Sequence, residues 1–145
     1  MDISHYKKKI AFAGLALSVI SSLRSFFWPV DPNLERYSRS ATVTHGKVLH
    51  LEHYYSMNVD CSANGQIVVR VTQLPTHGRA FVSDEMEHTF FVKGNQRYHC
   101  NAEKRPVVAV RYEPEIGYVG SDKLVVDVLF PDGVNRVSTF SITVK

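Results

Sequence analysis

The sequence is short of the motifs on which catalysis and cofactor binding usually depend. It contains no G-x-S-x-G, no H-E-x-x-H and no glycine-rich loop that would hold a phosphate. Its two cysteines, Cys61 and Cys100, do not form a C-x-x-C pair, which disfavours a metal site. Internal repeats and low-complexity tracts are absent as well. We therefore expect a protein that is not an enzyme and that uses no cofactor.

A basic surface for nucleic acid is also missing. The formal net charge of +3 comes from Lys7, Lys8, Lys9 and Arg24, because only Asp2 opposes them in the first 24 residues. Beyond that point lie thirteen of the 17 Lys and Arg residues and thirteen of the 14 Asp and Glu residues, so the balance there is zero. Binding to DNA or RNA is therefore excluded.

The first 24 residues have the layout of an export signal. Three lysines precede Ile10 to Leu23, a stretch of 14 residues without a charge. This stretch is shorter than the about 20 apolar residues that cross a bilayer, and it is typical of the helical apolar region of a signal peptide. Three interpretations remain open: a cleaved signal peptide at 1–24, a retained anchor that contacts the membrane through residues 10–30, or a buried soluble helix. Either of the first two places the rest of the chain in the periplasm or at the cell surface.

Both cysteines lie in the part of the chain that would be exported. An even number of cysteines in an oxidising compartment favours a disulfide between Cys61 and Cys100. Such a bond would close a loop of about 40 residues and stabilise the fold by about 4 kcal/mol in the chain-entropy model. The alternative is a pair of buried free thiols.

The remainder of the chain predicts a linker at 25–40 and one all-β domain at 41–145. Apolar residues in the domain recur at period two in short runs that are separated by turns, without helical periodicity. Seven or eight strands of this kind indicate an antiparallel β-sandwich of two layers. The predicted strands are 41–44, 47–55, 66–72, 80–82, 89–92, 107–112, 124–128 and 137–144.

Short motifs follow one another in a characteristic order over about residues 66–144. They are L-P-T-H-G, Y-E-P, G-Y-V-G-S-D, P-D-G and S-I-T-V. The series resembles the bacterial Ig-like or cadherin-like repeats of large surface adhesins and other secreted proteins, which implies an Ig-like sandwich. The residues that carry the resemblance are Pro75, His77, Gly78, Tyr112, Pro114, Gly117, Tyr118, Gly120, Asp122, Asp132 and Gly133.

The chain departs from these repeats in several respects. It holds one copy instead of a tandem array, and it adds two cysteines and its own export signal. The Asp-rich calcium ligands that lie between such repeats are not evident. Antibody domains differ too, because the only tryptophan, Trp28, lies in the leader and the Cys-Trp-Cys core is absent. The resemblance therefore implies a fold and a secreted context.

The residues of this pattern predict structural roles. We expect Tyr112 and Tyr118 to pack their rings over the edge of the sandwich while their hydroxyls stay in water. Gly117 and Gly120 allow the tight corner between the sheets, and Asp122 can accept hydrogen bonds from backbone amides in that corner. A ligand-binding role for these residues is the weaker interpretation.

The seven histidines are further candidates for chemistry. His50 and His53 are three residues apart on a predicted strand, so we expect them to face opposite ways and not to chelate a metal together. Cys100 lies beside His99, but neighbouring residues of a strand also face opposite ways, which argues against a nucleophile pair.

These observations favour a non-enzymatic exported envelope protein. We expect one Ig-like domain that binds another envelope or surface protein, or belongs to a surface assembly. One alternative is a periplasmic protein that binds a metal or small ligand through its histidines, and another is a membrane-anchored accessory subunit. Candidate contact residues are Tyr54 and Tyr55, and Asp84, Glu85 and Glu87 of an exposed acidic turn predicted at 84–88.

Overall fold

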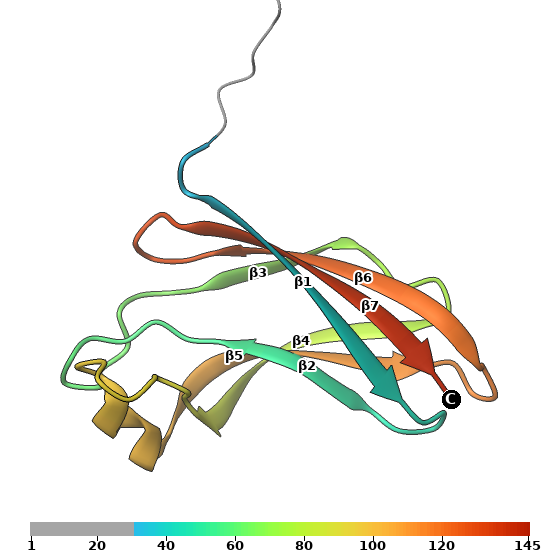
Figure 1. Cartoon of the computed structure of the whole chain (residues 1–145), viewed down its shortest axis with the longest axis horizontal. Coiled ribbons are helices and arrows are strands. Elements are labelled where there is room, and N and C mark those ends of the chain that lie inside the picture. Colours follow the sequence, from blue (N-terminus) through green and yellow to red (C-terminus); the bar gives the residue numbers. More distant parts are fainter. Residues whose placement is uncertain (1–30) are drawn as a thin grey trace, which may run out of the picture.

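The computed structural model describes residues 31–145, and Figure 1 shows their arrangement. The predicted leader at 1–24, with its apolar helix, and the beginning of the predicted linker lie outside the described residues. Within residues 31–145, none of the helices has the length and apolar character that crossing a membrane requires.

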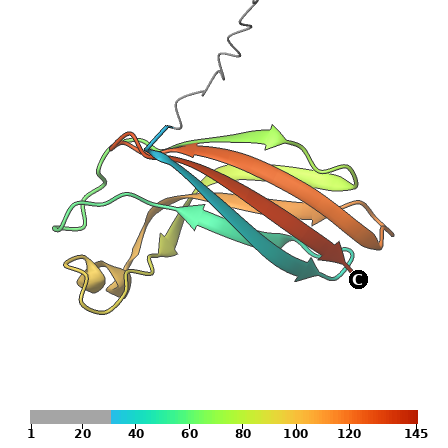
Figure 2. The ribbon, with the colours of Figure 1, turned by 45° about the horizontal axis from the view of Figure 1, so that its top comes forward.

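The described chain forms seven strands in two sheets, and the predicted all-β sandwich is confirmed at this level. One sheet has the order β1-β7-β6-β3 and the other the order β2-β5-β4. Figure 2 shows the two sheets as stacked layers. The strands are β1 (Leu34–Val43), β2 (Leu49–Tyr54), β3 (Val68–Gln73), β4 (Gly78–His88), β5 (Lys104–Pro114), β6 (Gly120–Leu129) and β7 (Asn135–Val144).

The first strand corrects two predictions. It begins at Leu34, inside the segment predicted as a linker at 25–40. Its ten residues pair in parallel with β7, from Leu34 beside Asn135 to Val43 beside Val144, so the sandwich is not wholly antiparallel. The segment Leu34–Ser40 has mostly polar, exposed side chains because it lies at a sheet edge, and hydrophobic alternation could not reveal it as a strand.

The middle of the chain contains another correction. The acidic turn predicted at 84–88 is the second half of β4, and the strand predicted at 89–92 is irregular chain. A short 3-10 helix, η1 (Tyr98–Ala102), follows. Sequence alternation does not reveal β4 as one long strand. The side of β4 that faces the other sheet carries the polar residues Asp84 and His88, and the opposite side carries the apolar residue Phe81.

The core lies between the two sheets and follows the predicted alternation in the second half of the chain. Leu124, Val126 and Val128 of β6 are 0% exposed, and the alternate residues of β7 from Phe140 to Val144 are also buried. Burial of each such side chain stabilises the fold by about 1.5–3 kcal/mol. The sheets thus form a rigid frame with loops at its two ends.

Candidate functional site

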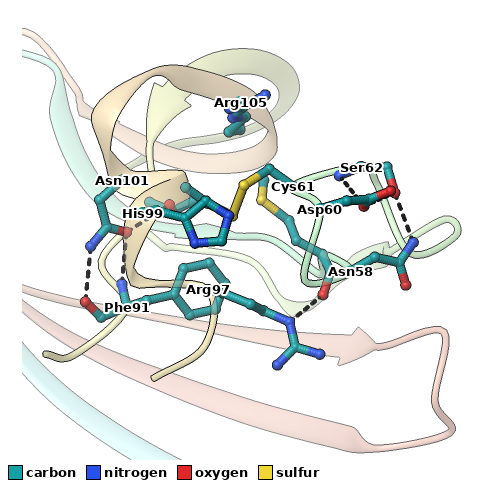
Figure 3. Close-up of a disulfide and its surroundings, with 12 residues drawn as sticks. Asn58, Asp60, Cys61, Ser62, Phe91, Arg97, His99, Asn101 and Arg105 are labelled. Atoms are coloured by element: carbon teal, nitrogen blue, oxygen red, sulfur yellow. Dashed lines mark hydrogen bonds between the residues drawn. A yellow bond between two sulfur atoms is a disulfide. The ribbon is translucent and has the colours of Figure 1, made fainter. Parts of the chain in front are cut away.

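The clearest candidate site is the loop of residues 89–103, which connects β4 to β5 and is called the braced loop below. It lies at the end of the sandwich opposite the C-terminus, beside the segment that follows β2 (Figure 1). The Asn101 side chain holds its two halves together (Figure 3). The Asn101 Oδ1 accepts hydrogen bonds from the Thr89 hydroxyl at 2.8 Å and the Phe91 amide at 2.9 Å, and its Nδ2 donates to the Phe91 carbonyl at 2.9 Å. One side-chain amide therefore fixes three polar groups of the loop.

The second brace is the predicted disulfide, which the structure confirms. Cys61 and Cys100 are bonded, with their Cα atoms 5.5 Å apart. Both half-cystines and Met57 form a small buried cluster, against which Tyr55 and Phe91 pack. This cluster and the Asn101 bonds give the loop a small core of its own, separate from the core of the sandwich.

The braced loop nevertheless exposes two large apolar side chains. Phe90 is 72% and Val92 is 74% exposed. The Phe90 amide donates a hydrogen bond to the Tyr55 hydroxyl at 2.8 Å, and its ring centroid lies 5.5 Å from that of His53. The backbone that carries Phe90 is therefore fixed while the side chain stays open to solvent.

Two hollows flank Phe90 on the side of β2. One has a volume of about 320 Å³ and is lined by residues that include Tyr54, Tyr55 and Phe130. The other, of about 380 Å³, is lined by residues that include His50 and His88. Phe90 and His53 line both, so the exposed ring stands between two concave surfaces.

His50 and His53 do not lie as the sequence predicted. A β-bulge in β2 makes Leu51 an extra residue, since His50 pairs with Arg111 and Glu52 with Val110. The alternation shifts by one residue at the bulge, and the two histidine rings lie 5.4 Å apart between centroids. The prediction of opposite faces was wrong because strict alternation does not hold across a bulge.

The predicted contact tyrosines have different positions. Tyr54 is only 3% exposed and its ring packs edge-on against Phe130, so it cannot serve as a contact residue. Burial raises the pKa of its hydroxyl. Tyr55 is half-buried and supports the braced loop through Phe90 and Phe91. Tyr55 therefore positions the backbone of the braced loop.

The predicted acidic contact residues lie on β4. Asp84 is exposed, while Glu87 lies 3.9 Å from the ammonium of Lys104. Glu85 accepts hydrogen bonds from the Arg111 guanidinium, at 2.9 Å to Nε, and from the Ser83 hydroxyl at 2.8 Å. These bonds, with Arg111 first, lower the pKa of Glu85 to about 2. Glu85 is therefore an ionised strand residue with a partner.

The motif residues form a corner at the other end of the sandwich. Asp122 is 8% exposed and accepts hydrogen bonds from the amides of Thr76 at 2.8 Å, His77 at 2.9 Å and Lys123 at 2.8 Å, as predicted. The Tyr112 hydroxyl also donates to Asp122 at 2.9 Å. Tyr112 is 0% exposed, so the prediction that its hydroxyl stays in water was wrong. The Tyr112 side chain points from β5 into the core, where its hydroxyl donates to the Asp122 carboxylate and not to water.

The charges in this corner are set by burial and hydrogen bonding. Burial alone would raise the pKa of Asp122, but the three amides and the Tyr112 hydroxyl outweigh it, and the pKa lies below its usual value. Burial, and then the bond to Asp122, raises the pKa of Tyr112. An ionised acid beside a neutral phenol is a stable structural pair.

Other motif residues complete the same corner. The His77 and Tyr118 rings stack with centroids 4.1 Å apart, and the Tyr118 hydroxyl donates to the Ser121 carbonyl at 2.7 Å. Gly78 is required because a Cβ there would lie 2.4 Å from the Tyr112 ring. Pro114 ends β5 and Gly120 begins β6, while Pro75 and Gly117 lie in the adjoining connections. Asp132 and Gly133 do not belong to this corner, because they lie in the hairpin between β6 and β7, at the opposite end of β6.

Cys61, His99 and Cys100 are brought together, with their candidate ligand atoms within 4.8 Å of one another. The Cys100 Sγ lies 3.8 Å from the His99 Nε2 because both residues belong to η1, and not to a strand as predicted. In the disulfide, neither sulfur is a thiolate, so neither can ligate a metal as a thiolate or attack as a nucleophile. The arrangement is structural in the oxidised protein.

Sequence reasoning missed the residues that define the braced loop. Phe90, Val92 and Asn101 were not singled out, because the alternation at 89–92 predicts a strand. The half-cystine at position 100 was the available signal: a disulfide to Cys61 requires the loop to return to the segment after β2.

Comparisons with known proteins identify no family. No family model matches the chain, and no curated protein matches it in sequence. The solution structure of Amebosin has a TM-score of 0.39 and 13% identity, covering 79% of this chain and 100% of that chain. The structure of PbICP-C in complex with falcipain-2 has a TM-score of 0.37 and 8% identity, covering 78% of this chain and 92% of that chain. These scores are too low to transfer a function.

Proposed function

We propose that this chain is a non-enzymatic exported envelope protein whose single Ig-like domain binds another protein of the envelope or cell surface. The strand order supports the Ig-like assignment, since β2-β5-β4 and β7-β6-β3 correspond to the B-E-D and G-F-C strands of constant-type immunoglobulin domains. The disulfide supports an oxidising compartment. Both features suit a stable scaffold outside the cytoplasm.

The observation that carries the proposed binding role is the braced loop. Phe90 and Val92 are exposed apolar side chains on a backbone held by the disulfide and by Asn101. A rigid loop loses little conformational entropy when it binds, and apolar anchors that enter a partner's pocket dominate binding energy. The two hollows beside Phe90 offer room for side chains of the partner.

The test is to cross-link and purify the protein from the envelope of cells that export it, and to compare variants. Replacing both Phe90 and Val92 by Ser should reduce recovery of the partner by about tenfold or more, because two apolar anchors are lost. Ile116→Ser is the matched control. Ile116 is 101% exposed in the turn after β5, at the opposite end of that strand, and its change should leave recovery unchanged. Equal recovery with the double variant would contradict the proposal.

A second candidate function, binding of a metal ion, is favoured by the histidines of β2. The rings of His50 and His53 lie 5.4 Å apart between centroids, and the His53 Nε2 is buried without a hydrogen-bond partner. Imidazole is a ligand that zinc and copper prefer, and two neighbouring rings supply two such ligands, with water completing the coordination. Stoichiometric metal in the purified protein that disappears with His53→Ala would support this function over the first.

A further inference from the structure

Strand β4 is a long free edge of its sheet. Among the described residues it pairs with β5 alone, through eleven consecutive residue pairs from Gly78 beside Pro114 to His88 beside Lys104. The register has no bulge, and the strand contains no proline. A free edge of this kind presents a row of unpaired N–H and C=O groups that can pair with another strand.

The other sheet edges are better protected. Both β2 and β3 have six residues and an irregular register, and bulges of this kind bend an edge away from flat pairing. The ten residues of β1 are mainly polar and exposed in their first half. By contrast, β4 exposes three large apolar side chains, with exposed fractions of 38% for Phe81, 40% for Val82 and 53% for Met86.

The charges of β4 are complementary to those of a second β4 that runs in the opposite direction. The basic residue Arg79 lies near its start, while Glu85 and Glu87 lie in its second half. A twofold axis through Ser83 places Arg79 of each strand opposite Glu87 of the other. Both side chains are on the outer face of the sheet, where opposite charges that face each other across strands stabilise the pair.

The alternative registers are less favourable. Successive residues of an antiparallel strand direct their N–H and C=O groups alternately to the two sides, so only registers that pair residues of like parity can form hydrogen bonds. An axis through Asp84 would set that carboxylate opposite its own copy. An axis through Val82 would match Arg79 with Glu85, which already accepts hydrogen bonds from Arg111 and Ser83. The partners within the chain leave the Ser83 register more room, because Glu87 lies 3.9 Å from Lys104 and the exposed Arg79 has a single bond, to Glu113. Only the Ser83 axis pairs all eleven residues.

We propose that two copies of this chain associate through antiparallel pairing of their β4 strands about Ser83. The product is a continuous six-stranded sheet of order β2-β5-β4-β4-β5-β2. The pairing covers the exposed edge and adds two Arg79–Glu87 contacts, one at each side of the axis. Its contacts do not include Phe90 or Val92, although Glu87 and His88 also line the hollow beside Phe90. The inference therefore does not rest on the two apolar side chains that carry the proposed binding role of the braced loop.

Cysteine cross-linking of the full-length protein tests the register. Facing residues of an antiparallel pair have Cα atoms about 4.5–5.5 Å apart, which a disulfide can span. Ser83→Cys should therefore form a disulfide-linked dimer when oxidised with glutathione disulfide. Arg79→Cys alone should not cross-link, whereas an equal mixture of Arg79→Cys and Glu87→Cys should. Peptide mass analysis checks that Cys61 and Cys100 remain paired with each other.

Charge reversal tests the energetics by sedimentation equilibrium. Arg79→Glu should weaken dimerisation by about tenfold or more, because both contacts become repulsive. The double variant Arg79→Glu with Glu87→Arg should restore it. The Phe90→Ser, Val92→Ser protein should dimerise as the wild type does, which separates this inference from the role of the braced loop. A wild-type protein that stays monomeric, or a Ser83→Cys protein that cross-links no faster than Arg79→Cys, would overturn the proposal.

Discussion

At the scale of single residues, the motif that identifies the second half of the chain serves to build a corner. Asp122 receives four hydrogen bonds, from three backbone amides and the buried Tyr112 hydroxyl. Its role as an acceptor of amides follows from the type of residue and its place in a turn. The bond from Tyr112 could not be predicted in the same way, because β4 and β5 must pair before Gly78 leaves room for the Tyr112 ring.

Asp122→Asn should lower the free energy of unfolding by about 2 kcal/mol, since an amide cannot accept all the bonds that the carboxylate accepts and a buried donor loses its partner. Asp132→Asn is the matched control: this exposed side chain accepts one bond, from the Val134 amide at 3.1 Å, and Asn can accept it too. Its change should stay within about 0.5 kcal/mol. Urea unfolding at neutral pH measures both values. Equal effects of the two changes would refute the role of the corner.

At the scale of elements, the braced loop shows how a segment without regular hydrogen bonding becomes fixed. It has η1 and irregular chain where a strand was predicted, and its order comes from the disulfide, the small cluster around Met57 and the Asn101 bonds. The Arg97 guanidinium adds a hydrogen bond from Nε to the Met57 carbonyl at 2.6 Å. The disulfide and the Arg97 bond join residues that are about 40 positions apart in the sequence, so local propensity cannot indicate them.

Replacing Cys61 and Cys100 together by Ala should lower the free energy of unfolding by about 4 kcal/mol in the chain-entropy model. The loss should be uneven across the molecule. Amide hydrogen exchange should rise most in residues 89–103 and in the turn around Cys61, and least in β6 and β7, whose side chains fill the main core. Uniform acceleration over the whole chain would contradict an independent brace. The Ile116→Ser protein, changed at a fully exposed residue of a turn, is the control and should exchange as the wild type does.

At the scale of the whole molecule, two acids link stability to pH. The pKa of Glu85 is lowered to about 2 from 4.5, chiefly by Arg111, and the pKa of Asp122 is lowered from 3.8 by hydrogen bonds that outweigh its burial. The unfolded chain therefore binds protons more readily than the folded chain below about pH 5. The stability that these acids contribute is fully present above that pH and is lost as the pH falls.

Stability should accordingly fall between about pH 5 and about pH 2, measured as the midpoint of urea unfolding across this range. Glu85→Gln should flatten the dependence, because Gln does not titrate. Asp122→Asn should also flatten it, while lowering stability at neutral pH. If neither variant changes the slope, other groups control the acid transition.

The sequence by itself determined the all-β class and most of the core, and it favoured the disulfide over two free thiols. Period-two alternation is a local consequence of strand geometry, and it placed Leu124, Val126 and Val128 correctly because β6 lies between two strands with one face buried. With two cysteines in the chain, one intramolecular pairing was possible. Sequence alternation could not predict the polar edge strand or the bulge in β2. Residues 34–40 are extended through their pairing with β7, and the bulge is defined by the pairing of β2 with β5.

Tertiary structure alone decided which side chains and which strand edge are open to solvent, and these carry the two proposals. It moved His53 to the same side as His50 through a bulge, buried Tyr54, and exposed Phe90 and Val92 on a braced loop. It also left β4 as a free edge whose charges match an antiparallel copy of itself. Each of these features depends on which distant segment lies beside a residue, and side-chain periodicity along the chain carries no information about that neighbour.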